Sequence, residues 1–212
     1  MLCIAAGHTS VGIFERLVES YNQKKLDFSS AHFVAMDEWT GMSEKTPNSC
    51  GEFLSRCFFS KVNFKPGNIK LFDGAASSPD EECLAVQKFI KENSSDGVID
   101  FLVLGTGMNG HLALNEPGCD FELSCGVVPL DDITKQVAQK YFDTKQELLS
   151  GLTLGVAEFK KAKRSVLMVS GAHKREILHK ILSEPISNKI PATAVRDFVN
   201  ASIYCDRETY GG

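Results

Sequence analysis

Short apolar runs alternate along the chain with segments whose apolar residues recur at helical spacing. Strands are predicted at residues 2–6, 32–36, 69–72, 98–104, 126–128, 165–170 and 201–205. Helices are predicted at residues 11–21, 50–59, 78–93, 134–141, 156–162 and 173–182. Because the strands are almost continuously apolar and are separated by helices, they favour a mostly parallel sheet covered on both faces. The pattern therefore predicts an α/β protein with three layers, α/β/α.

Polar and glycine-rich segments follow several of these strands. They are residues 7–10, 37–39, 105–118 and 171–174. In a parallel sheet of this kind, ligands bind beyond the carboxyl ends of the strands. We therefore expect the four segments to converge on one site.

The composition is that of a globular protein. The chain has 212 residues, of which 43% are hydrophobic and 24% charged, and we expect residues 1–212 to form a single domain. The formal net charge is −4, without the basic excess that nucleic-acid binding requires, so no nucleic-acid partner is predicted. A local site can still bind a small anion, because geometry rather than net charge decides that.

No membrane or secretion signal is evident, and we predict a cytoplasmic protein. No apolar run approaches the roughly 20 residues that span a bilayer, and the first six residues are too short for a signal-peptide core. Seven cysteines without a C-x-x-C motif favour free thiols in a reducing compartment. No cysteine–histidine pair has zinc-ligand spacing, so no metal site is predicted.

The first polar segment is Gly7-His8-Thr9-Ser10, between a predicted strand and a predicted helix. Backbone N–H groups and the helix N-terminus at such a turn favour an anion, typically a phosphate. A plain turn with a Ser or Thr helix cap explains the same residues. The turn matches neither nucleotide-binding glycine motif, so no nucleotide is implied.

The second segment, Met36-Asp37-Glu38-Trp39, ends an apolar strand with two adjacent carboxylates. Neighbouring side chains of a strand point to opposite faces, so one carboxylate is free to face a cleft. Such a group, shielded by Trp39, is a candidate general base. A solvated pair at the start of a loop remains the alternative.

The richest segment, residues 104–118, follows the most apolar strand. It contains three glycines, at positions 105, 107 and 110, together with Asn109, His111, Asn115 and Glu116. Glycines permit tight turns and close approach of the backbone to a ligand. The imidazole of His111 can carry a proton, and Glu116, five residues on, is placed to orient it. This run is difficult to explain by packing alone.

Two lysines are candidate anion contacts. Lys174 follows the strand at 165–170 and falls in the first turn of a predicted helix, where a cation is unfavourable unless an anion is bound. Lys140 lies within Gln139-Lys140-Tyr141-Phe142. A solvated surface position explains Lys174 equally well, and for Lys140 taken by itself it is the simpler interpretation.

Taken together, these segments resemble the glucosamine-6-phosphate deaminase/isomerase family from residue 1 to about residue 206. Residues 107–117 (Gly-Met-Asn-Gly-His-Leu-Ala-Leu-Asn-Glu-Pro) resemble its ring-opening loop, and Met36-Asp37-Glu38 resembles its enolisation motif. Asp37-Glu38-Trp39, Asn48-Ser49-Cys50, Leu152-Thr153-Leu154-Gly155 and Ile190-Pro191-Ala192 look most similar to galactosamine-6-phosphate isomerases. The related 6-phosphogluconolactonases differ where this chain has Asn115-Glu116-Pro117. The resemblance implies a Rossmann-like fold.

The resemblance also implies a set of site residues. His111 would open the sugar ring, supported by Glu116 and Asn109, and Asp37 would move the C2 proton to C1. The 6-phosphate would be bound by the turn at residues 7–10 together with Lys140 and Lys174. The partner is then a small sugar phosphate, no cofactor is needed, and a homo-oligomer is compatible with the sequence.

Three departures from the family pattern stand out. Asn109 replaces an aspartate of some members, so the histidine depends more on Glu116 for negative charge. Lys140 replaces an arginine of glucosamine enzymes and lacks the directional guanidinium fork. The family also carries an N-terminal helix and strand before the first motif, which the resemblance implies are absent here. A 6-phosphogluconolactonase and a non-catalytic sugar-phosphate sensor remain alternatives.

Overall fold

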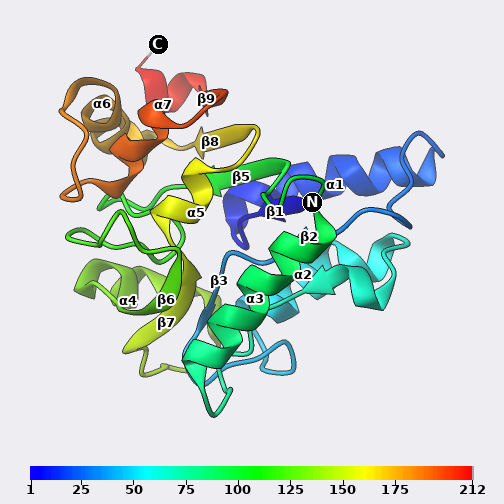
Figure 1. Ribbon diagram of the computed structural model, residues 1–212. Helices are drawn as coiled ribbons and strands as arrows, with labels where there is room; N and C mark the ends of the chain where they lie inside the picture. The colour runs from blue at the N-terminus through cyan, green and yellow to red at the C-terminus, as the bar shows by residue number, and fades with distance from the viewer. Residues whose placement is uncertain (212) are drawn as a thin grey trace.

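The computed structural model describes residues 1–211, which are built around a parallel sheet of six strands (Figure 1). The strands, in sheet order, are β4 (Ile69–Lys70), β2 (Phe33–Val34), β1 (Leu2–Ile4), β5 (Phe101–Gly105), β8 (Ser165–Val169) and β9 (Ala201–Cys205). Every pairing in this sheet is parallel. The chain therefore winds outward in both directions from β1, and the order reverses between β1 and β5, which is the position where doubly wound folds bind ligands.

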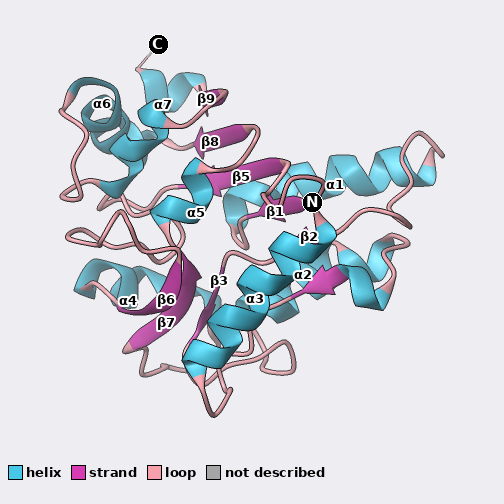
Figure 2. Cartoon of the chain, viewed as in Figure 1, coloured by secondary structure: helices cyan, strands magenta, loops and turns pink. Residues whose placement is uncertain are grey.

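Helices cover the sheet on both faces, so the predicted α/β class with a mostly parallel sheet is confirmed. The helices are α1 (His8–Asn22), α2 (Cys50–Cys57), α3 (Pro79–Asn93), α4 (Asp132–Ala138), α5 (Val156–Lys160), α6 (Arg175–Ser183) and α7 (Arg207–Tyr210). Figure 2 shows α3 and α5 in front of the sheet and α1 behind it. No helix within residues 1–211 is long and apolar enough to cross a lipid bilayer.

A second, smaller sheet was not predicted. It contains β3 (Asp37–Trp39), β7 (Ser150–Leu154) and β6 (Cys125–Pro129), paired antiparallel in the order β3-β7-β6. The prediction that Asp37 only ends the strand at 32–36 is therefore wrong, because the chain leaves the large sheet after Val34 and enters the small one at Asp37. Strand β7 escaped prediction because Gly151 and Thr153 interrupt its apolar run.

Other differences concern short elements. Helix α1 begins at His8 rather than at residue 11, so Thr9 and Ser10 lie inside its first turn and do not cap it. A 3-10 helix at Pro191–Asp197 has no apolar period that could have predicted it. The backbone of Ala192 donates a hydrogen bond to the carbonyl of Gly110 (2.8 Å), so this helix supports the glycine-rich loop.

The main core fixes the ends of two helices relative to the large sheet. Phe14 of α1 stacks on the fully buried Phe58, which directly follows α2, with ring centroids 5.1 Å apart. Phe33 of β2 packs edge-on against the same ring. Packing of large aromatic side chains in this way leaves little freedom of position. The N-terminal ends of α1 and α2 are thereby held beside the same cavity, described next.

Candidate active site

A cavity of about 500 Å³ lies beyond the carboxyl ends of β1 and β5. Its walls come from both sheets: the turn after β1 and the loop after β5 belong to the large sheet, and Asp37 and Trp39 of β3 to the small one. Nine of the predicted site residues line it, namely Gly7, His8, Thr9, Ser10, Asp37, Asn109, His111, Lys140 and Lys174. The tenth, Glu116, lies behind His111 and contacts its ring. The four polar segments thus converge on one site.

The first turn of α1 forms one end of the cavity. Gly7 precedes the helix without any side-chain cap, and no acidic residue lies in the first turn. The N–H of Ser10 donates to the carbonyl of Gly7 (3.0 Å), so the N–H groups of His8 and Thr9 and the positive end of the helix dipole are available to an anion. The helix start observed at His8 removes the alternative of a Ser- or Thr-capped turn.

Two lysines approach this end of the cavity. Lys174 donates a hydrogen bond from Nζ to the carbonyl of Thr106 (2.7 Å), which fixes its ammonium group at the cavity wall. Burial lowers the pKa of Lys174, and the nearby charge of Lys140 lowers it further. Within residues 1–211 neither lysine forms an ion pair. A bound anion would offset this mutual repulsion.

Lys174 precedes the α-helix in whose first turn it was predicted to lie. It ends a short 3-10 helix, Ala172–Lys174, and precedes α6, so it is not in the first turn of an α-helix. Gly171 before it has a φ of 96°, a left-handed conformation that glycine adopts without strain. This turn directs the lysine back toward the loop after β5.

His111 is held by three neighbours. Its Nδ1 lies 3.1 Å from Oγ1 of Thr134 and 3.4 Å from Oε2 of Glu116. Asn109 donates from Nδ2 to the same Glu116 oxygen (2.8 Å). With Nδ1 engaged, Nε2 is the ring nitrogen left to exchange a proton with a ligand.

Glu116 is buried, with 7% of its surface exposed, and this placement controls its charge. Burial raises the pKa of Glu116, but hydrogen bonding and attraction to His111, with smaller contributions from Thr134 and Asn109, bring the net pKa below its ordinary value. Glu116 is therefore ionised at neutral pH. A carboxylate in this position orients the imidazole and stabilises its protonated form.

Gly107 makes room for the His111 ring. A Cβ atom at this position would lie 2.3 Å from Cε1 and 2.6 Å from Nδ1 of His111. Gly107→Ala is therefore expected to displace the ring and to lower catalytic activity about 10²-fold, the loss typical of a misplaced reactive group. Steady-state kinetics and thermal melting of the variant test this.

Gly12→Ala is the matched control, because a Cβ at Gly12 meets nothing within 4 Å and Gly12 does not line the cavity. This variant should keep full activity. If Gly107→Ala does so too, the His111 ring does not need its observed position.

Asp37 belongs to β3 of the small sheet, whereas His111 lies in the loop after β5 of the large sheet. Both residues line the same cavity. Burial and the adjacent charge of Glu38 raise the pKa of Asp37 to about 7, against a smaller lowering by a hydrogen bond with the Cys50 thiol. A carboxyl group with a pKa near the working pH is suited to act both as a general base and, once protonated, as an acid.

Glu38 has a different task from Asp37, as expected for neighbours on a strand. Its carboxylate accepts hydrogen bonds from three backbone N–H groups, those of Trp39 (2.9 Å), Cys50 (3.1 Å) and Gly51 (2.8 Å). Cys50 and Gly51 are the first residues of α2, so Glu38 joins β3 to the N-terminus of that helix.

Glu38→Ala is expected to lower the free energy of unfolding by about 1–3 kcal/mol, because it leaves buried N–H donors without an acceptor. Urea denaturation at pH 7 measures this effect. Glu38→Gln keeps the shape and one acceptor oxygen, so its loss should be smaller. Equal stability of Glu38→Ala and the unmodified chain would contradict the anchoring role.

The cavity is also lined by residues that were not predicted as site residues, among them Cys50, Thr134 and Tyr141, whereas Trp39 was expected beside the general base. Thr134 contacts His111, and the Tyr141 ring stacks on His8 with centroids 5.2 Å apart. Thr134 and Tyr141 lie on a predicted helix, but no local pattern indicates which face of it meets the cavity. Cys50 has no chemical signal of its own, since a buried cysteine is usually a small apolar side chain, and only the resemblance of Asn48-Ser49-Cys50 singles it out.

A doubly wound fold with a buried general-base candidate, an oriented histidine and a helix N-terminus facing one cavity places the chain among α/β enzymes. Residues 1–203 match the family described as glucosamine-6-phosphate isomerases/6-phosphogluconolactonase. The chain belongs to this family.

Individual relatives agree with that assignment. The chain is 32% identical to a glucosamine-6-phosphate deaminase of Thermoanaerobacter pseudethanolicus, over 98% of this chain and 81% of the relative. It is 31% identical to glucosamine-6-phosphate deaminase 1 of Bacillus subtilis, over 98% of this chain and 85% of the relative.

Solved structures agree as well. The fold superposes on a monomeric glucosamine-6-phosphate deaminase with a TM-score of 0.93 at 30% identity, covering 99% of this chain and 86% of that one. It also superposes on a 6-phosphogluconolactonase of Thermotoga maritima with a TM-score of 0.73 at 20% identity, covering 96% and 83% of the two chains. The second likeness concerns the fold alone.

Proposed function

We propose that residues 1–212 form one catalytic domain that deaminates an amino-sugar 6-phosphate and isomerises it to the ketose 6-phosphate. The substrate is galactosamine 6-phosphate or glucosamine 6-phosphate, and the products are tagatose or fructose 6-phosphate and ammonia. One observation carries the proposal: Asp37 and His111 face the same cavity, whose end is the uncapped first turn of α1. The names of the relatives support the substrate class.

In this mechanism the phosphate binds at the N-terminus of α1. The backbone N–H groups of residues 7–9 and the hydroxyls of Thr9 and Ser10 contact its oxygens, and Lys174 and Lys140 supply positive charge. This anchoring places the sugar ring between His111 and Asp37. Holding the reacting carbons beside both groups supplies the proximity on which the later steps depend.

His111 opens the ring. It takes the proton of the C1 hydroxyl and returns a proton to the ring oxygen, so that the C1–O5 bond breaks and the open-chain aldehyde forms. Glu116, ionised and within 3.4 Å of Nδ1, stabilises the imidazolium that forms in between. Asn109 holds Glu116 in place without adding negative charge.

Asp37 then isomerises the open chain. It removes the C2 proton while the aldehyde oxygen O1 gains one, giving an enolamine, and delivers its proton to C1 as the nitrogen loses one, which leaves an imine at C2. Water adds to C2, ammonia departs, and the ketone remains. All these steps are proton transfers and additions, so no cofactor takes part. A well-placed acid or base contributes about 10²–10⁴-fold to each.

The proposal favours galactosamine 6-phosphate as the preferred substrate. The support is the likeness of Asp37-Glu38-Trp39, Asn48-Ser49-Cys50 and Ile190-Pro191-Ala192 to galactosamine-6-phosphate isomerases, whereas the relatives named above are glucosamine-6-phosphate deaminases. Two of these segments line the cavity, through Asp37, Trp39 and Cys50, and the third contacts the loop that carries His111, through the backbone of Ala192 and Gly110.

The test is a coupled ammonia assay with both amino-sugar phosphates at matched concentrations. We expect turnover of at least one and a higher kcat/KM for galactosamine 6-phosphate. Folded protein that releases ammonia from neither would overturn the proposal. Hydrolysis of 6-phosphogluconolactone above the spontaneous rate, lost in His111→Ala, would instead establish the lactonase.

A further inference from the structure

Tyr141 is a cavity residue to which the mechanism above gives no task. It ends the 3-10 helix Gln139–Tyr141, directly after α4. Its ring is nearly parallel to that of His8, with centroids 5.2 Å apart and an interplanar angle of 21°. The ammonium group of Lys140 lies 5.0 Å from its centroid. These contacts hold the ring, and with it the direction of the hydroxyl, in place.

The hydroxyl of Tyr141 lies between the two ends of the cavity. It is 4.0 Å from the position of a Cβ on Gly7, and hence near the anion-binding turn. Tyr141 also packs against the buried cluster that contains Trp39 and Cys50, and both of these residues line the cavity together with Asp37. A ligand that reaches from the turn to Asp37 must pass it.

This hydroxyl makes no hydrogen bond to any atom of residues 1–211. Tyr141 is partly buried and lines the cavity, so its hydroxyl faces a space that a ligand can occupy. Nothing in the rest of the described chain requires the hydroxyl, since a phenylalanine ring would stack on His8 equally well. The oxygen is therefore available to a ligand.

We propose that the Tyr141 hydroxyl hydrogen-bonds to the C4 hydroxyl of the substrate and sets the preference between the two C4 epimers. This inference rests on the proposed function. With the phosphate on C6 at the α1 turn and C1 and C2 at Asp37, the carbons from C3 to C5 lie in the stretch that Tyr141 borders. C4 is the carbon at which galactosamine and glucosamine differ.

A single phenol is sufficient for such a choice. A site that hydrogen-bonds a substrate hydroxyl discriminates strongly against a substrate that cannot form the bond, because a buried polar group is then left unpaired. The direction of the phenol is fixed by the ring contacts with His8 and Lys140. It therefore serves one epimer and not both.

The experiment compares kcat/KM for the two amino-sugar 6-phosphates in the unmodified chain and in Tyr141→Phe. We expect the ratio of the two values to move at least about 10-fold toward unity in the variant, as loss of one substrate hydrogen bond implies. An equal loss for both epimers would overturn the proposal and indicate a phosphate contact. An unchanged ratio with unchanged rates would also overturn it.

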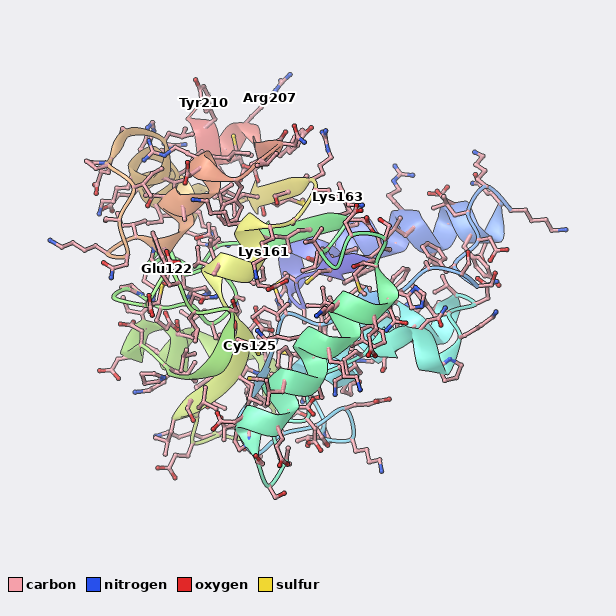
Figure 3. All side chains as sticks on the ribbon, viewed as in Figure 1. Glu122, Cys125, Lys161, Lys163, Arg207 and Tyr210 are labelled. Atoms are coloured by element: carbon pink, nitrogen blue, oxygen red, sulfur yellow. The ribbon has the colours of Figure 1, made fainter. Side chains whose placement is uncertain are left out.

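Tyr210→Phe is the matched control, because Tyr210 is 65% exposed and projects outward from α7 (Figure 3). It should leave the ratio unaltered. A 4-deoxy amino-sugar 6-phosphate removes the same bond from the ligand side. We expect Tyr141→Phe to cause no further loss with this analogue. A full additional loss would contradict the C4 contact.

Binding measurements separate a failure of this inference from a failure of the proposed function. Trp39 is the only tryptophan and lines the cavity, so its fluorescence reports sugar-phosphate binding without turnover. If neither epimer releases ammonia, the proposed function fails. The Tyr141 inference is then judged on the ratio of the two dissociation constants, which Tyr141→Phe must move to support it.

Discussion

Asp37→Asn is expected to lower the rate of ammonia release by about 10²–10⁴-fold, the contribution of a positioned general base. Asparagine has nearly the shape of aspartate but cannot accept the C2 proton. Asp37 is the carboxylate that faces the cavity, because Glu38 is bound to the N-terminus of α2. The coupled ammonia assay measures the loss, and exchange of the C2 proton with deuterated solvent should stop with it.

The variant should still bind substrate, which Trp39 fluorescence can follow. Asp197→Asn is the matched control, since Asp197 pairs with Lys160 at the surface and its side chain is 59% exposed. Deamination by Asp37→Asn within tenfold of the unmodified rate would assign the base to another group. Loss of binding together with activity would indicate a structural defect instead.

The same substitution is expected to stabilise the fold at alkaline pH. The pKa of Asp37 is raised from 3.8 to about 7 in the folded protein, so folding disfavours its charged form. Below about pH 3 the group is protonated in both states and imposes no cost. The cost grows between pH 4 and pH 7 and is complete above it, reaching about 4 kcal/mol for three pKa units. Asparagine carries no such cost.

Urea denaturation at a series of pH values tests this effect. The difference in unfolding free energy between Asp37→Asn and the unmodified chain should be smallest at about pH 3 and largest at pH 8 and above. A difference that is independent of pH would show that the pKa of Asp37 is not raised. The expected combination, a more stable and nearly inactive variant, is typical of residues whose burial serves function.

The large sheet was predictable because each of its strands can be recognised locally in the sequence. Each is a short apolar run followed by a helix, and the strand-helix alternation alone implies parallel pairing. The small sheet was not, because β3 and β7 meet across more than a hundred residues and neither is apolar throughout. Gly151 in β7 is explained only by its surroundings, since a Cβ there would lie 2.2 Å from Cδ1 of Leu114.

The site was predictable to the extent that its chemistry is concentrated in short segments. Gly7–Ser10, Asp37 and His111 could be proposed because each follows a strand and carries unusual residue types. Tyr141 could not be proposed, because its position in the site depends on stacking against His8, which begins α1 and is distant in sequence. The division of labour between Asp37 and Glu38 was expected from strand geometry, but which of the two faces the cavity was settled by the position of α2.

The cavity joins two sheets that differ in strand direction and in place within the fold. A sugar phosphate with its anionic end on α1 and its reacting carbons at β3 would act as a strut between them. Ligand binding then contributes to cohesion of the tertiary structure, and mass action makes the bound form harder to melt. During a catalytic cycle the bound substrate would thus add contacts between the two sheets, and release of the product would remove them.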